Sequence, residues 1–402
     1  MNRPHLTACL VALSLLGAAV VAGLFYARRV EGRYIHALAT ELFEQKNQGG
    51  ALQAEAFRQA DLLPLYGSSE LGKYPSFADP IEFFRTYPTG FSVFPVGNAG
   101  ATSLSVLQAL AAVGPELRGK KLVLSITPGW LVLGDAADPD HYAGNFSRLH
   151  AVEMIFNSDL GPPLKRAVAR RMLEFPDTLD RDPLLKIALE ALADGSLSRQ
   201  ALFCVALPLG KLEALVLRLQ DHWETLGLIR SRPDLAPDVP RQAARLDWPS
   251  LLALAEREAQ QRADNNPFGF DSQYWDARLK KLTQRQVRSS DQAFLESVQG
   301  AVGWSDLDLL LRGLSEAGAR PLILSAPIKG VYSDYWGVSA RARSAYYLKL
   351  RAVAEPYGVP VLDFADHDED MYFVADHFSH PSQKGWIYYD RALDAFYHGR
   401  LD

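Results

Sequence analysis

Serine, histidine and aspartate occur in two short stretches of this 402-residue chain, each after an apolar run. In GSSEL, Ser68 and Ser69 follow the run LLPLY after one glycine, and in DHFSHPSQKGW, His380 lies four residues after Asp376. An acyl-transfer site needs a nucleophilic hydroxyl, an imidazole that takes its proton, and a carboxylate that orients the imidazole. Each stretch by itself is also typical of an ordinary polar turn. The chemistry therefore depends on whether the fold brings the two stretches together.

Short apolar runs bounded by Gly, Pro or Ser predict the strands that position these residues. Helical patterns such as SLSVLQALAAV and DLDLLLRGLSEAG lie between several of the runs. This alternation predicts an α/β fold with a doubly wound parallel sheet buried on both faces. Ligands bind beyond the carboxyl ends of such strands, so the serine stretch and the histidine stretch are predicted to share one sheet edge. The predicted strands lie within residues 62–67, 91–97, 121–128, 320–327 and 358–364.

A charged and mostly helical segment at about 138–305 interrupts this alternation and is predicted to be an insertion. Its most apolar part is Ala201–Trp223. We favour a buried helix of the insertion for this part. The alternative is a helix that faces a membrane or a partner.

The N-terminal segment Leu6–Ala27 is 22 residues long and carries no charge, and about 20 apolar residues suffice to span a bilayer. We predict an uncleaved anchor at 1–29, a helical stalk at 30–59 and the main domain at 60–402. Cleavage after Ala22 is the alternative. The basic residues that follow the segment would by themselves place the domain inside the cell.

Composition excludes several classes of function. The net charge is −5 and no long basic run occurs, which argues against a nucleic-acid partner. The two cysteines, Cys9 and Cys204, provide neither a disulfide framework nor a zinc site. No metal-ligand cluster, phosphate-binding glycine loop or nucleotide motif appears, so no cofactor is predicted.

The order of the two polar stretches resembles the SGNH (GDSL-like) hydrolase superfamily. Its Gly-Asp-Ser block corresponds here to GSS, which makes Ser69 the nucleophile and puts Ser68 in the place of the aspartate. Its second block corresponds to NAGATS, which implies that the N–H groups of Ser69 and Gly100 form the oxyanion hole. The third block, Gly-x-Asn-Asp, is absent, and the matching strand end reads SITPGWL.

Further motifs resemble the DltD family, in the family's order, from the anchor to Trp386: GSSEL, TPGWL, NFS at 145–147, SAPIKGVYSDYWG, the tyrosine pair at 346–347, and HPSQKGW. HPSQKGW favours His380 over His377 as the base. The family usually has Ser-Pro-Gln-Trp where this chain has TPGW. It spaces its aspartate and histidine as D-x-x-H, one residue closer than Asp376 and His380, which leaves Asp370 or Asp368 as alternative orienting acids.

This resemblance implies a membrane-anchored, extracytoplasmic acyl-transfer protein that acts in D-alanylation of teichoic acid or a related cell-envelope polymer. The implied partners are a membrane-bound O-acyltransferase of the DltB type, a D-alanyl donor or carrier, and the polymer. It also implies a single N-terminal anchor with the domain outside the cytoplasmic membrane. Two alternatives stay open: a non-catalytic scaffold that binds carrier or polymer, and a polysaccharide O-acetyltransferase.

Overall fold

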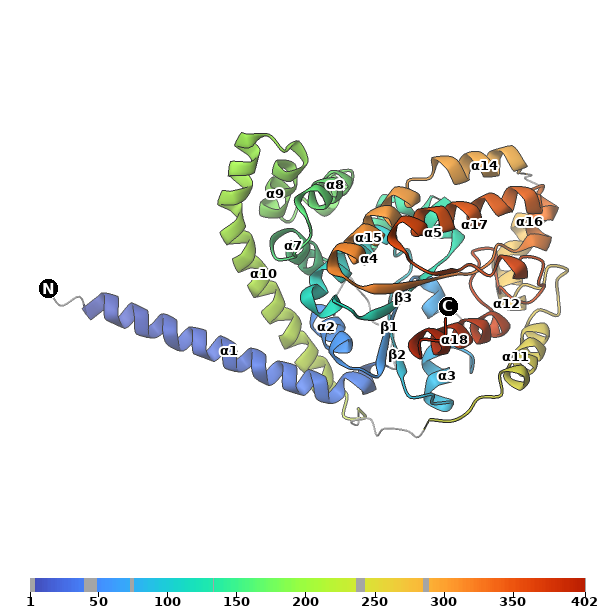
Figure 1. Ribbon diagram of the computed structural model, residues 1–402, viewed down its shortest axis with the longest axis horizontal. Helices are drawn as coiled ribbons and strands as arrows, with labels where there is room; N and C mark the ends of the chain where they lie inside the picture. The colour runs from blue at the N-terminus through green and yellow to red at the C-terminus, as the bar shows by residue number, and fades with distance from the viewer. Residues whose placement is uncertain are drawn as a thin grey trace.

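A five-stranded parallel sheet, ordered β2-β1-β3-β4-β5, forms the centre of the protein (Figure 1). The computed structural model describes residues 4–39, 49–72, 76–132, 134–235, 243–284 and 289–401. All five strands fall within the predicted apolar runs, and the predicted doubly wound α/β fold is confirmed. The strands are β1 (Leu62–Gly67), β2 (Ser92–Gly97), β3 (Lys121–Ile126), β4 (Arg320–Ser325) and β5 (Val361–Leu362).

Successive residues of each strand enter two different cores, which explains why the runs are apolar without interruption. In β1, Leu62 and Tyr66 join the core on one face of the sheet, whereas Leu63 and Leu65 join the core on the other. The first face is covered mainly by α2 (Gly50–Arg58), α4 (Ser103–Val113), α15 (Gly303–Ala317) and α17 (Ala340–Ala354). The second face is covered by α3 (Pro80–Thr86), α11 (Trp248–Arg262) and α18 (Gln383–Tyr397).

The described residues between β3 and α15 form only helices and turns, as expected for the insertion. One group of these helices stacks beside α4, and α11 crosses to the opposite side of the body to pack on α18 (Figure 1). A short helix, α16 (Gly330–Trp336), follows β4. The segment between β3 and α15 contains α5 (Pro128–Val132), α6 (Pro139–Asn145), α7 (Arg148–Phe156), α8 (Pro162–Met172), α9 (Pro183–Asp194), α10 (Leu197–Ser231), α11, α12 (Ser272–Tyr274), α13 (Lys280–Gln284) and α14 (Asp291–Gly300).

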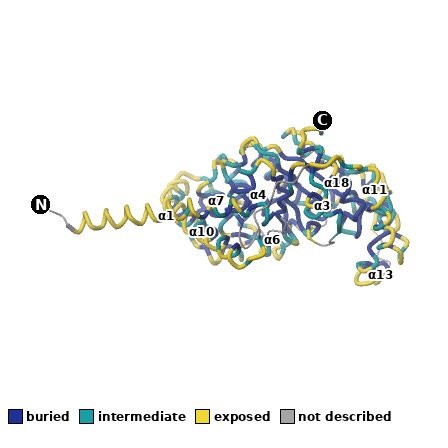
Figure 2. Tube along the Cα trace, turned by 90° about the horizontal axis from the view of Figure 1, so that it is seen from below, coloured by how far each residue is buried: buried dark blue, intermediate teal, exposed yellow. Residues whose placement is uncertain are grey.

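The chain begins with α1 (Pro4–Leu38), whose N-terminal part projects from the body with its side chains exposed (Figure 2). This helix is long and apolar enough to cross a membrane. Its last turns are different, because Ile35 and Leu38 are buried in the main core. Helix α2 is also buried, with Leu52 and Phe57 packed in the same core. The described parts of 30–59 are mostly helical, and the last turns of α1 and all of α2 pack against the body.

Candidate active site

The serine stretch lies where β1 ends, next to the end of β2. Gly67 pairs with Gly97 across the two strands, and a Cβ atom on Gly97 would lie only 2.6 Å from the Gly67 carbonyl oxygen. This close approach brings the two loops that follow the strands together. Ser68 is buried and donates its hydroxyl to the Asn98 carbonyl at 3.3 Å. Ser69, which opens a short 3-10 turn, is partly exposed and is the hydroxyl that a ligand can reach.

The histidine stretch, 311 residues further along the chain, meets this loop. The Ser69 Oγ lies 2.8 Å from Nε2 of His380, and Nδ1 of His380 lies 2.6 Å from Oδ2 of Asp376. Asp376 and His380 are both buried. With Nδ1–H donated to the carboxylate, Nε2 is the acceptor for the serine hydroxyl. The predicted three residues are therefore joined in one chain of hydrogen bonds.

The longer spacing between Asp376 and His380 is accommodated by a tight loop. Ser379 has a φ of +63°, and the N–H of Ala375 donates to the His380 carbonyl at 2.8 Å across the base of the loop. The second carboxylate oxygen, Oδ1 of Asp376, accepts from the N–H groups of Phe378 at 2.9 Å and His380 at 3.3 Å. Both oxygens are thus held in place, and the acid is oriented despite the extra residue.

The alternative acids and the alternative histidine bind other partners. Asp370 contacts Nδ1 of His367 at 3.3 Å and the ammonium of Lys384 at 2.8 Å. Asp368 accepts from the buried guanidinium of Arg343, and Nδ1 of His377 contacts the hydroxyl of Tyr274 at 2.8 Å.

Gly100 lies in the loop after β2, on the same sheet edge as Ser69. Its φ is +77°, and a Cβ atom there would lie 2.8 Å from the ring of His141. Only glycine fits this backbone conformation and this contact without strain. The side chain of Asn145 donates to the carbonyls of Ala99 at 3.0 Å and His141 at 2.9 Å. Asn145 of the NFS motif thus holds the loop that contains Gly100. The sequence showed this motif as part of the family resemblance but not its structural role.

Glu70 is a further acidic group at the site that we did not predict. It is buried, and its Oε1 accepts from the N–H of Ser68 at 2.9 Å. Burial raises the pKa of this carboxyl, and the nearby charge of His380 partly offsets that rise. His380 therefore has a second carboxyl group in its surroundings in addition to Asp376.

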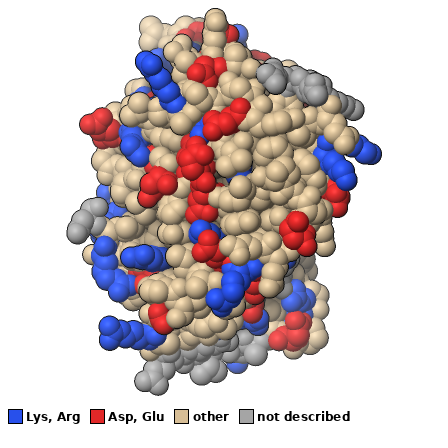
Figure 3. All heavy atoms as spheres, turned by 90° about the vertical axis from the view of Figure 1, so that its right-hand side faces the viewer, with Lys and Arg blue, Asp and Glu red and all other residues tan. Residues whose placement is uncertain are grey.

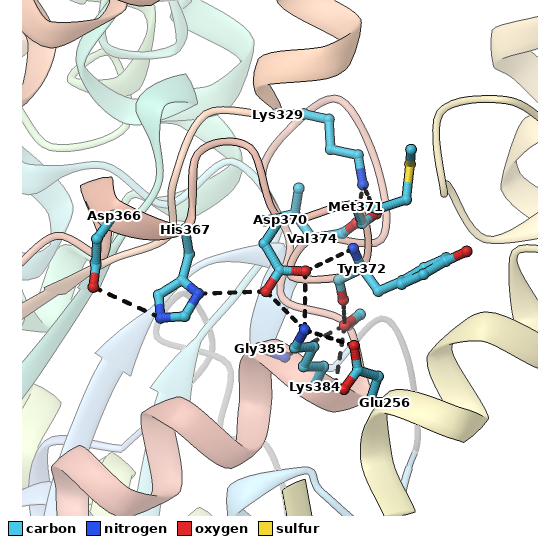
Figure 4. Close-up of polar contacts among 11 residues, drawn as sticks. Glu256, Lys329, Asp366, His367, Asp370, Met371, Tyr372, Val374, Lys384 and Gly385 are labelled. Carbon is cyan, nitrogen blue, oxygen red and sulfur yellow. Dashed lines mark hydrogen bonds and ion pairs between the residues drawn. The ribbon is translucent and has the colours of Figure 1, made fainter. Parts of the chain in front are cut away.

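Lys329 supports the loop that carries His380 through backbone carbonyls and was also not predicted (Figure 4). Its buried ammonium nitrogen donates to the carbonyls of Met371 and, at 3.4 Å, of Val374 and Gly269. Burial lowers the pKa of Lys329 to about 7. Since Val374 lies two residues before Asp376, this amine ties the start of the loop to the segment after β4.

A second cation fixes the other end of the loop, where α18 begins. Lys384 contacts both Asp370 and Glu256, and Ser382 donates its hydroxyl to the Tyr372 carbonyl while capping α18 (Figure 4). Burial alone would raise the pKa of Asp370, but hydrogen bonds from His367 and Lys384 outweigh burial and lower it. The HPSQKGW stretch thus holds the loop in addition to supplying His380.

Within the described ranges, no group of three or more His, Cys, Asp or Glu side chains has an arrangement that could hold a metal ion.

Comparison with known proteins identifies the relatives of this chain. A sequence model of the DltD protein family matches residues 39–398. Protein DltD of Bacillus subtilis (strain 168) is 29% identical over 361 residues, which cover 89% of this chain and 88% of that protein. Protein DltD of Staphylococcus aureus (strain NCTC 8325 / PS 47) is 26% identical over 392 residues, which cover 96% of this chain and 92% of that protein. Because the match extends over nearly the whole chain, through both stretches of the candidate site, this chain belongs to the DltD family.

Proposed function

We propose that this protein is a membrane-anchored, extracytoplasmic serine acyltransferase that acts in D-alanylation of teichoic acid or a related envelope polymer. The observation that carries the proposal is the hydrogen-bonded series of Ser69, His380 and Asp376, in a chain that belongs to the DltD family. A partly exposed serine beside a buried, oriented imidazole has the arrangement that nucleophilic acyl transfer needs.

In the first half-reaction, Ser69 Oγ attacks the carbonyl carbon of a D-alanyl ester or thioester. His380 takes the hydroxyl proton at Nε2, and the carboxylate of Asp376 stabilises the resulting imidazolium. The N–H groups of Ser69 and Gly100 stabilise the oxyanion of the tetrahedral intermediate. The bond to the leaving group then breaks, His380 returns the proton to that group, and D-alanyl-Ser69 remains.

In the second half-reaction, a hydroxyl group of the polymer attacks the acyl-enzyme. His380 takes the proton of this hydroxyl, and as the Ser69 ester bond breaks it passes that proton to Ser69 Oγ, which restores the free serine hydroxyl. Water is a slower acceptor in the same step. The partners in this scheme are a membrane-bound O-acyltransferase, a D-alanyl donor or carrier, and the polymer.

The test is covalent labelling of the full chain with a serine-reactive fluorophosphonate, followed by mapping of the adduct. We expect an adduct on Ser69 that is lost in Ser69→Ala. The matched control is Ser68→Ala, because this neighbouring hydroxyl is buried against a carbonyl and should not react. If the folded protein forms no adduct at Ser69, the scaffold alternative replaces the enzymatic one.

Labelling is paired with a cellular measurement. D-alanyl esters on the envelope polymer are quantified in cells that carry Ser69→Ala as the sole copy. Full D-alanylation with an intact, folded Ser69→Ala protein would contradict the proposed chemistry, since loss of the nucleophile commonly costs several orders of magnitude in rate.

A further inference from the structure

Helix α10 has an apolar outer side. Its inner side, which includes Ala206, Gly210 and Ala214, packs against the body. On the opposite side, large apolar side chains are strongly exposed: Val205 is 72% and Trp223 is 72% exposed. These outward residues recur every three or four positions and so form one continuous row. We define the outer row of α10 as Ala201, Val205, Pro208, Leu212, Leu215, Leu219 and Trp223, of which Leu219 is half-buried and the others are exposed.

This exposed row corrects the interpretation of Ala201–Trp223 as a buried helix. From Val205 to Trp223, 18 residues further along the chain, the row extends for about 27 Å along the helix. The face of the molecule away from α1, by contrast, carries many Lys, Arg, Asp and Glu side chains between its other residues (Figure 3). A long apolar row of this kind on a soluble surface indicates a surface that is covered in the working protein.

The position of α10 relative to α1 indicates what covers the row. The two helices meet at their C-terminal ends, where the buried Glu31 carboxylate contacts Nδ1 of His222 at 2.6 Å. Glu31 lies about one turn beyond Ala27, the last residue of the uncharged part of α1. Trp223 is therefore close to the level at which α1 leaves a bilayer, where tryptophan is preferred.

From this junction, the two helices diverge as two arms on the same side of the body. Figure 1 shows α10 along the edge of the body on the side toward which α1 projects, with α7 and α9 between it and the rest of the body. The outer row thus faces the side from which the anchor enters the membrane. Arg28 and Arg29 are exposed at the same junction and suit the anionic headgroups of lipids.

We propose that the outer row of α10 docks onto the lipid bilayer, so that the protein binds the membrane through two helices, one that crosses it and one that lies in its interface. The apolar row enters the boundary between headgroups and acyl chains, as in other interfacial amphipathic helices. This second contact fixes the orientation of the body relative to the membrane surface. The inference rests on the membrane anchoring that is part of the proposed function.

The test uses the exposed Cys204, which neighbours the outer row. The full chain with Cys9→Ser is labelled at Cys204 with the fluorophore NBD and reconstituted in vesicles of phosphatidylcholine and phosphatidylglycerol. We expect a blue shift of NBD emission and quenching by lipids that carry a nitroxide near the headgroup. The matched control is Cys9→Ser/Cys204→Ser/Leu348→Cys, labelled at an exposed apolar position on α17. This control should show neither change.

Charge substitutions provide the second arm. Leu212→Glu/Trp223→Glu changes two exposed residues of the outer row, so the fold is retained, and it should abolish the quenching at Cys204. Leu348→Glu, at a position that is 63% exposed, should leave the quenching unchanged. Circular dichroism checks the fold of both variants.

The outcomes separate this inference from the anchoring itself, which is measured by flotation of the vesicles. Protein that floats while Cys204 remains unquenched keeps its anchor and overturns the inference. Protein that does not float overturns both. A blue shift that depends on protein density and not on nitroxide lipid shows that a second copy covers the row, and it also overturns the inference.

Discussion

At the level of single residues, the acid that orients His380 lies at a spacing that differs from the one implied by the motif resemblance. The spacing of Asp376 and His380 is one residue longer than D-x-x-H, yet both carboxylate oxygens of Asp376 are held by the histidine loop. We predict that Asp376→Asn lowers the rate of fluorophosphonate labelling by roughly ten-thousandfold, because the amide no longer fixes the reactive tautomer of His380. Asp366→Asn, at a carboxylate that is 84% exposed, is the control and should label normally.

Two glycine-to-alanine substitutions, at Gly100 and at Gly358, separate the effect of backbone strain from that of local packing. Gly100→Ala introduces a side chain at positive φ and presses it against His141. We expect a loss of about 1–2 kcal/mol of unfolding free energy from the backbone, together with a large loss of Ser69 labelling because the loop must shift. Gly358→Ala also has a positive φ but no atom near its Cβ position, so it should lose stability and keep labelling. Equal labelling in both variants would contradict a role for the Gly100 loop.

At the level of elements, the loop before α18 depends on a buried amine. Lys329→Met removes the donor to the Met371 and Val374 carbonyls. We predict a fall in Ser69 labelling of about a hundredfold, the order expected for misplacement of a catalytic group by about 1 Å. We also expect faster amide exchange at 374–380.

The control for this substitution is Lys349→Met. Lys349 likewise donates to two backbone carbonyls, but it does so at α14, far along the chain from the histidine loop. The Lys349→Met substitution should leave both the labelling of Ser69 and amide exchange at 374–380 unchanged. If both lysine variants behave alike, the effect is one of general stability.

The start of α3 gives a prediction about pH. Asp79 caps this helix by accepting from the N–H of Ile81 at 3.0 Å, and burial raises its pKa to about 6. The folded state therefore retains a proton that the unfolded state loses near pH 4, so unfolding free energy falls as pH rises toward and through 6. Asp79→Asn keeps the cap and should reduce this fall by about 1 kcal/mol.

Urea unfolding at pH 4.5 and 7 measures this difference. Asp138→Asn changes a more exposed cap, at the start of α6, and serves as the control. The buried Asp390, whose pKa is raised by its burial and by the charge of Asp79, remains in both variants. A wild-type slope that persists in Asp79→Asn would assign the pH dependence to Asp390 instead.

At the level of the whole molecule, truncation separates the proposed anchoring role of α1 from its packing against the body. A variant that begins at Arg28 lacks residues 1–27, which include the uncharged segment, and should stay folded without floating with vesicles. A variant that begins at Gly49 also loses Ile35 and Leu38, each of which is buried in the main core. Burial of such a side chain stabilises by roughly 1.5–3 kcal/mol. We therefore expect a clearly lower unfolding temperature for the shorter variant, measured by calorimetry.

The sequence alone determined the strands, the two polar stretches and their order, because a strand buried on both faces requires an uninterrupted apolar run bounded by turn residues. It also determined, through motif resemblance, the family. Three matters could only be decided by the tertiary structure. The first is that Asp376, and neither Asp370 nor Asp368, contacts His380, because loop geometry over a few residues depends on backbone angles such as that of Ser379.

The second is the set of hydrogen bonds that support the site. Lys329 and Asn145 donate to backbone carbonyls of Met371 and Ala99, which lie in other loops, far from them in the sequence. The third is the side of α10 that faces outward. Composition shows that Ala201–Trp223 is apolar, but burial depends on which neighbours pack against each side of the helix. Small residues such as Ala206 and Gly210 let α10 approach the body, and the larger Val205 and Leu212 are left exposed. Hydrophobicity is a local property of the sequence, whereas burial is a property of the assembled fold.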